Sequence, residues 1–211
     1  EIFEFVCREL PFGHGRLSVD RLLLKRREFE FSLFAQLESE HVLPVIEKGF
    51  SSVDTFVKYS HSVSNRRKAR SGSSLESNLA AIFTDFGLAF DSQVKTEHKK
   101  RPDFIFPSGK AYHDSSFPSE LLRMMAAKTC CKDRWRQVIN EADRINAKHL
   151  FTLQEGVSGD QLGEMHAHKV KLVVPKPHLS SFPKDWRSRI STLEKFVGEV
   201  GKNQDQINGL D

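Results

Sequence analysis

The feature that most constrains the fold is a series of short apolar segments in the second half of the chain. Strand composition occurs in five segments, at residues 89–95, 103–106, 120–127, 150–153 and 170–174. Helical patterns separate the later segments, over residues 133–147 and 159–166, and Pro175 ends the last strand. Strands that alternate with helices at this spacing predict an α/β fold.

The first third of the chain has helical patterns instead. A helix is expected from Ser18, and a second pattern covers about residues 43–59, with a break near Ser51 or Ser52. After a polar segment over residues 65–72, Ser73 or Ser74 is expected to cap a further helix that ends by Gly87. A last amphipathic helix is expected over residues 186–200.

We therefore divide the chain into an N-terminal helical extension over residues 1–65, a core over residues 66–200 and a polar tail over residues 201–211, which we expect to be disordered. The extension is expected to serve in dimerisation or in contacts with a ligand. The first residue is Glu1, so we also expect that the chain is a piece of a longer protein.

The charge balance permits a polyanionic partner without requiring one. Lys and Arg number 32 against 28 Asp and Glu, for a net charge of +4, and the pI is near 9.0. Four basic residues occur within five positions, which is typical of contacts with a nucleic-acid backbone. These are Arg66, Arg67, Lys68 and Arg70. A solvated basic loop is the alternative.

Three cysteines, two of them adjacent, cannot form a paired disulfide framework, and they lack the spacing of a zinc site. A reducing, cytoplasmic setting is therefore expected. No apolar run approaches the roughly 20 residues needed to span a bilayer, and the start lacks the pattern of a signal peptide. We expect no membrane association.

The central stretch carries the residues that metal-dependent phosphodiester hydrolysis needs. Asp103 follows Pro102 at the start of an apolar strand, and Lys128 ends the next apolar run, so both side chains are expected at one edge of the sheet. Carboxylates suit a hard cation such as Mg²⁺, and a lysine can offset the charge of a phosphate. Nucleases with this arrangement commonly carry a second acid two residues before the lysine, and this chain has Ala126 at that position.

Glu141 is the expected replacement for that acid. It lies thirteen residues after Lys128, on the predicted helix over residues 133–147, and can point back toward the site. Glu76, in the first turn of an earlier helix, is expected to assist through water. Each residue also has an alternative explanation. Asp103 can be a turn residue and Lys128 a surface lysine. Glu141 can pair with Arg144, and Glu76 can be an acid favoured by the helix dipole.

Three runs of residues resemble a known family. They are Arg101-Pro102-Asp103-Phe104, the run from Lys128 through Gln137 followed by Glu141, and Ser71-Gly72-Ser73-Ser74-Leu75-Glu76. In residue type and spacing they resemble the C-terminal catalytic domain of EcoRII-type restriction endonucleases, a branch of the PD-(D/E)XK superfamily, from about Arg66 onward. The resemblance implies a mixed central β-sheet flanked by helices. It also implies Mg²⁺-dependent cleavage of double-stranded DNA by a bacterial homodimer, at a five-base-pair site of which CCWGG is the expected form.

The resemblance further implies how the site is read. Lys132, Asp133 and Arg134, just after the catalytic lysine, are expected to contact the outer C·G pairs, because Lys and Arg pair with guanine and Asp accepts from cytosine. Asp133 as a helix N-cap is the alternative. Arg27 and Phe31, four residues apart, are expected to contact flipped central bases. Arg26 is the alternative to Arg27, and a core position is the alternative for Phe31.

The family also implies an N-terminal effector domain that these residues do not supply, and we expect cleavage without an effector copy of the site. The main alternative function is a DNA-binding module on the same fold that has lost its chemistry. A second alternative is a repair or junction nuclease that recognises DNA structure instead of sequence.

Overall fold

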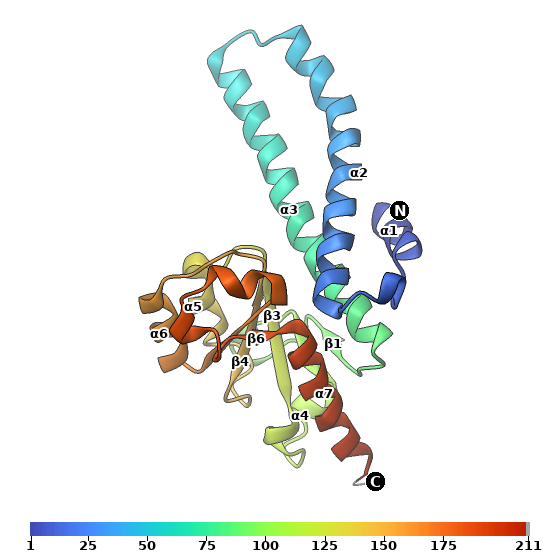
Figure 1. The fold of residues 1–211 in the computed structure, drawn as a ribbon. Helices are drawn as coiled ribbons and strands as arrows, with labels where there is room; N and C mark the ends of the chain where they lie inside the picture. Colours follow the sequence, from blue (N-terminus) through green and yellow to red (C-terminus); the bar gives the residue numbers. More distant parts are fainter. Residues whose placement is uncertain (210–211) are drawn as a thin grey trace.

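Two long helices, α2 (Val19–Lys48) and α3 (Val53–Asp85), form a hairpin that rises from a sheet-based core in the computed structural model, which describes residues 1–209. Figure 1 shows the short helix α1 (Ile2–Glu9) beside the lower part of α2. Gly49, at φ 78°, ends α2. Ser52 then begins α3 with a capping box, in which its hydroxyl accepts from the Thr55 amide and the Thr55 hydroxyl accepts from the Ser52 amide.

The expected break near Ser51 or Ser52 is confirmed, whereas the alternative of a loop at the basic segment and the expected helix start at Ser73 or Ser74 are wrong. Residues 65–72 lie inside α3, which continues without interruption to Asp85, so the boundary drawn between residues 65 and 66 falls within one helix. Arg, Lys and Ala are strong helix formers, and the buried stripe that follows holds the lower half of the helix in place. Ser74 is buried against α2 and caps nothing.

The core contains a six-stranded mixed sheet in the order β1-β2-β3-β4-β5-β6. The first three strands pair antiparallel, and the pairs from β3 to β6 are parallel. The strands are β1 (Asp91–Ser92), β2 (Phe104–Phe106), β3 (Arg123–Lys128), β4 (Lys148–Thr152), β5 (Val170–Val174) and β6 (Ser191–Thr192). The predicted α/β fold with a mixed sheet is confirmed.

Helices cover both faces of this sheet. The remaining α-helices are α4 (Gly109–His113), α5 (Trp135–Val138), α6 (Gly159–Ala167) and α7 (Leu193–Asn208). Short 3-10 turns connect them, at His14–Arg16, Glu97–Lys99, Ser119–Leu121, Lys132–Arg134, Lys176–Ser181 and Lys184–Trp186. Among the described helices, none has an apolar stretch of the length that crossing a membrane requires.

Alternation along β3 shows how the two faces differ. Met124 and Ala126 point into a cluster with α5 and α6, whereas Met125 and Ala127 point into a cluster formed by the base of α2, the lower half of α3 and α7. Both clusters are fully buried around the strand, so β3 is the centre of the core. The lower half of α3 therefore belongs to the same packing unit as the sheet.

Three further elements depart clearly from their predicted form. Only Asp91–Ser92 of the segment 89–95 is a strand, and Gln93 follows at φ 55°. The helix predicted over residues 133–147 ends at Val138. The last helix begins at Leu193 and runs to Asn208, so residues 201–208 are helical instead of a disordered tail. Gln204 holds this end by hydrogen bonds with both the amide and the carbonyl of Ala89.

Candidate active site

Asp103 lies directly before β2, with 7 % of its surface exposed. Oδ2 accepts from the Ala127 amide at 2.7 Å and from Lys128 Nζ at 2.9 Å, and Oδ1 accepts from Gln93 Nε2 at 2.9 Å. The antiparallel pairing of β2 with β3 places the start of one strand beside the end of the other. The carboxylate is therefore held at the sheet edge where β3 delivers its lysine.

Lys128 is the last residue of β3 and pairs in register with Thr152 of the parallel strand β4. Its side chain is partly exposed, and its ammonium forms an ion pair with Asp103. Residues Met124–Ala127 are buried, so Lys128 is the first residue after them whose side chain reaches solvent. The expected convergence of Asp103 and Lys128 at one edge is found in the structure.

Glu141 does not lie on a helix, contrary to prediction. It follows α5 in a turn closed by a hydrogen bond from its amide to the Val138 carbonyl at 3.1 Å, and the next residue, Ala142, has φ 52°. The pKa of Glu141 rises to about 7, first because of burial, against the opposing effect of Lys128 and with a further rise from Asp103. Its buried Oε2 has no hydrogen-bond partner.

Glu76 comes from the lower half of α3 and is partly buried. Burial raises its pKa, and the charge of Asp103 raises it further while Lys128 lowers it. The charges of Asp103 and Lys128 thus act on both Glu76 and Glu141. Four residues from four separate parts of the chain thus share one electrostatic site.

The donor set fits a hard divalent cation. Glu141 Oε2 is a buried carboxylate oxygen without a partner, and the Asp103 carboxylate lies close enough to affect its pKa. Within residues 1–209, no three His, Cys, Asp or Glu side chains form a ready metal cluster. Mg²⁺ is commonly held by one or two carboxylates together with water and substrate phosphate, so two protein ligands suit it.

The turn that carries Glu141 is held by two buried or partly buried cations. Lys148 Nζ donates to the main-chain carbonyl oxygens of Ala142, at 2.5 Å, and Ile145. Arg144 does not pair with Glu141, contrary to the alternative considered from the sequence; its guanidinium donates to main-chain carbonyl oxygens of residues 111–117, including Asp114 at 2.8 Å. These hydrogen bonds hold the chain after Val138 in a turn, where the sequence predicted a helix.

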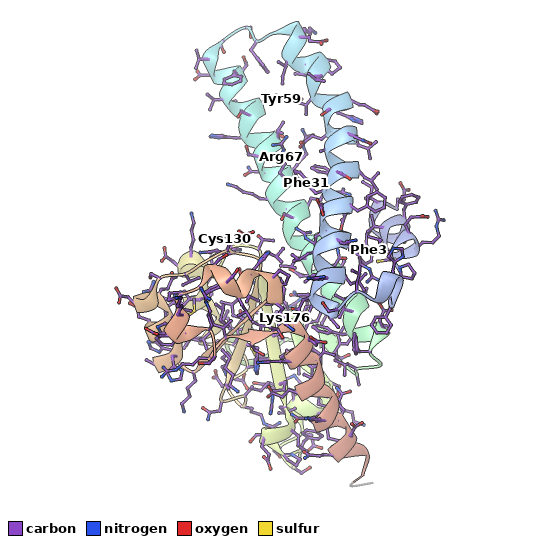
Figure 2. All side chains as sticks on the ribbon, viewed as in Figure 1. Phe3, Phe31, Tyr59, Arg67, Cys130 and Lys176 are labelled. Carbon is purple, nitrogen blue, oxygen red and sulfur yellow. The ribbon has the colours of Figure 1, made fainter. Side chains whose placement is uncertain are left out.

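A groove of about 670 Å³ lies between the hairpin and the loop after β3. Cationic and aromatic side chains predominate in its lining, which consists of Arg27, Glu30, Phe31, Phe34, Arg67, Lys68, Arg70, Ser71, Ser74, Thr129, Cys130, Lys132 and Arg134. In Figure 2, Phe31 lies on α2 and Arg67 on α3, both above Cys130 of the loop. The predicted base-reading residues Lys132 and Arg134 thus share one groove with the helical hairpin.

Arg27, and not Arg26, faces this groove. Arg26 is 2 % exposed; its Nε donates to the Leu10 carbonyl at 2.8 Å and its guanidinium pairs with Asp85, so it is a structural residue. Arg27 donates to the hydroxyls of Ser71 and Ser74, and its buried Nε has no partner.

Phe31, on the next turn, is 64 % exposed, so the alternative of a core position is wrong. The other predicted contact residues divide between two faces of α3. Arg70 stacks on Phe34 at 4.6 Å, and Arg67 pairs with Glu38, both on the groove side. Arg66 instead lines a shallow surface on another side of the helix.

Asp133 is exposed and approaches Arg136 at 3.5 Å. It makes no capping bond to the helix, so the N-cap alternative is not found. Apart from this ion pair, the side chain extends into solvent beside Lys132 and Arg134.

Two residues of the site had no role in the sequence-based prediction. Gln93, which orients Asp103, has no sequence signal because its contact depends on the pairing of β1 with β2. Lys148, which holds the Glu141 turn, had one available signal: a lysine at the first position of a buried strand needs a buried partner. The three cysteines are free, as expected.

The fold is that of restriction endonucleases. The structure superimposes on PspGI in a complex with substrate DNA, with a TM-score of 0.78, 16% identity and coverage of 97% of this chain and 92% of that chain. It also superimposes on metal-depleted Ecl18kI bound to uncleaved, modified DNA, with a TM-score of 0.77, 18% identity and coverage of 97% and 78%.

The chain belongs to the EcoRII C-terminal family, whose model matches residues 34–197. It is 52% identical over 201 residues to the type II restriction enzyme EcoRII of Escherichia coli, a match that covers 95% of this chain. The chain spans about half the length of that relative, at 49%. The family resemblance noted from the sequence is therefore confirmed.

Proposed function

We propose that this chain is the catalytic domain of a Mg²⁺-dependent, site-specific endonuclease that cleaves both strands of DNA. One observation carries the proposal: Asp103, Lys128 and Glu141 converge at a sheet edge, and the loop that leaves this edge lines a cationic groove. The relative named as a type II restriction enzyme supports the same reaction. A mere DNA-binding module would not need an unpartnered buried carboxylate such as Glu141.

The proposed roles follow from position. Asp103 and Glu141 would hold Mg²⁺, which when bound stabilises charge on the scissile phosphate and lowers the pKa of water. Lys128, at the open end of β3, would orient the phosphate and the attacking water. Glu76 would bind water at the edge of the site, since its partly buried carboxylate faces the same charges.

Sequence recognition is proposed for the groove. Lys132 and Arg134 line it and carry the donors that guanine accepts, while the exposed carboxylate of Asp133 would accept from cytosine. Arg27 and Phe31 would contact flipped central bases, because one offers an unpartnered donor and the other an exposed ring. Arg67, Lys68 and Arg70 would bind phosphates, and Arg66 would do so only outside the groove. The proposed site is CCWGG.

A homodimer is proposed as the active form. One chain supplies one set of Asp103, Lys128 and Glu141. Hydrolysis of both DNA strands in one encounter would use two such sets. A near-palindromic site matches a two-fold symmetric pair of chains. Sedimentation of the chain with and without a CCWGG duplex tests this, and a single copy on DNA that is cut in both strands would contradict it.

Plasmid digestion with Mg²⁺, followed by sequencing of the cut ends, tests the activity and gives the site and overhang. Asp103→Ala and Lys128→Ala should each abolish cleavage and retain specific binding in Ca²⁺. Asp205→Ala and Lys202→Ala, at exposed positions of α7, are matched controls that should cleave normally. Full cleavage by both site variants would refute the mechanism, and cuts at junctions or flaps without sequence preference would indicate the repair-nuclease alternative.

A further inference from the structure

The loop that follows the catalytic strand makes a tight turn at its base-reading residues. Lys132 has φ 23°, in the positive region that residues other than glycine rarely adopt. The Arg134 amide donates to the Cys131 carbonyl at 2.7 Å and closes the turn. A backbone in this conformation persists only where surrounding groups hold it.

Gln154 provides much of that hold. Its Oε1 accepts from the amide of Cys131 at 3.0 Å, from the amide of Lys132 at 3.3 Å and from the Cys130 thiol at 3.1 Å. Its Nε2 donates to the Gly156 carbonyl at 3.0 Å, which fixes the orientation of the amide. One side chain thus binds three consecutive residues of the turn.

Gln161, on α6, holds the other side of the same residue. Its Nε2 donates to the Lys132 carbonyl at 2.5 Å. The backbone of Lys132 is therefore bound at its amide by Gln154 and at its carbonyl by Gln161. Neither glutamine lines the groove, so neither is positioned to read a base itself.

The position of Gln154 also connects the turn to the cutting residues. It lies two residues after Thr152, which pairs in register with Lys128, and its amide donates to the Thr152 hydroxyl at 3.1 Å. The end of β4 thus contacts both the strand end that carries the catalytic lysine and the turn that carries the base-reading residues. A shift of this turn would change the distance between the base contacts and the scissile phosphate.

We propose that Gln154 is a positioning residue that determines sequence discrimination, by fixing the Lys132–Arg134 turn relative to Lys128, with Gln161 as its second support. The inference rests on the proposed base-reading function of that turn. Gln154 acts on the outer C·G pairs through the backbone, without touching DNA. Loss of Gln154 should therefore reduce discrimination more than it reduces the capacity to bind Mg²⁺ or DNA in general.

The test compares single-turnover cleavage and Ca²⁺-supported binding for a CCWGG duplex and for a duplex with one outer C·G pair replaced by T·A. Gln154→Leu should lower the ratio of the two cleavage rates at least tenfold. It should leave the Mg²⁺ concentration for half-maximal rate and the affinity for random-sequence DNA unchanged. Gln154→Glu keeps the acceptor and should restore most of the ratio, whereas Gln206→Leu, exposed on α7, should behave as the wild type.

A purely structural function would reduce the folded fraction without changing the ratio. A folded Gln154→Leu with the wild-type ratio would overturn the inference and leave the proposed function intact. If Gln154→Leu does not fold, Gln161→Ala decides: a lowered ratio supports the clamp and an unchanged ratio overturns it. A wild-type chain that cuts DNA without preferring CCWGG over the altered duplex would overturn the base-reading function and this inference together.

Discussion

Lys148 Nζ donates a 2.5 Å hydrogen bond to the carbonyl oxygen of Ala142, the residue directly after Glu141. The lysine is 6 % exposed, and burial lowers its pKa. A buried ammonium thus fixes a turn at which the backbone has positive φ and from which the displaced acid extends. The metal ligand proposed at Glu141 depends on this contact between the start of β4 and the turn after α5.

The first prediction concerns this contact. Lys148→Met keeps the length of the side chain but leaves the carbonyls of Ala142 and Ile145 without a donor, which should cost about 1–3 kcal/mol of unfolding free energy. The Mg²⁺ concentration for half-maximal cleavage should rise, because the Glu141 turn loses its support. Urea unfolding and a Mg²⁺ titration measure the two effects. An exposed control away from this turn, Lys184→Met, should change neither by as much.

The second prediction concerns the charge of Glu141. Its pKa in the folded protein is about 7, above the ordinary value of 4.5, so folding stability is full at acidic pH and falls as the pH rises through about 7. Without metal, Glu141→Gln should therefore be more stable than the wild type at pH 8, by on the order of 1–3 kcal/mol, and gain little at pH 4.5. It should also cleave no DNA. Urea unfolding in EDTA at the two pH values measures the gain, and equal stability at pH 8 would contradict it.

The third prediction concerns His149 on β4. Burial lowers its pKa to about 4, and the ring lies 5.0 Å from Phe196 between ring centroids. The unfolded chain takes up a proton near pH 6.5, so the folded state loses about 2 kcal/mol between pH 7 and pH 5 from this residue. His149→Gln should remove that part of the pH slope, whatever its stability at pH 7. Urea unfolding at both pH values gives the slope, which would be unchanged if the imidazole were charged in the fold.

The fourth prediction separates three neighbouring residues of α2. Arg26→Ala should lower the unfolding free energy by roughly 1–3 kcal/mol, because it leaves the Leu10 carbonyl without its buried donor and removes the ion pair with the exposed Asp85. Phe31→Ala should change it by less than about 0.5 kcal/mol, since the ring is exposed.

In a CCWGG duplex with 2-aminopurine at the central position, Phe31→Ala and Arg27→Ala should reduce the fluorescence rise on binding. Destabilisation by Phe31→Ala with a normal fluorescence rise would refute this assignment.

The sequence predicted the parts of the site that depend on strand periodicity. Asp103 and Lys128 each lie where a buried apolar run meets a charge, and the absence of an acid at Ala126 led to Glu141. The placement of Asp103 and Lys128 needs only the two-residue repeat of a strand, whereas Glu141 was inferred from the missing acid and from a helix that ends before it. The mixed sheet followed from the family resemblance.

What the sequence did not predict depends on contacts between distant segments. The polar residues 65–72 have the composition of a loop, but they are helical because the lower half of α3 packs on the sheet. Ser74 donates to Glu30 instead of capping a helix. The turn at Glu141 exists because Lys148 supplies hydrogen bonds that a helix would otherwise supply. Arg26 and Arg27 are adjacent in sequence, and the contacts of Arg26 with the distant Leu10 and Asp85 distinguish it from the arginine that lines the groove.

The unbroken course of α3 from Val53 to Asp85 limits how the length of this protein can vary. One residue inserted between Arg70 and Glu76 would rotate the groove-facing arginines by about 100° relative to the carboxylate below them and raise them by about 1.5 Å. Insertions or deletions among relatives should therefore be found at the hairpin tip, Gly49–Ser52, or come as whole helical turns.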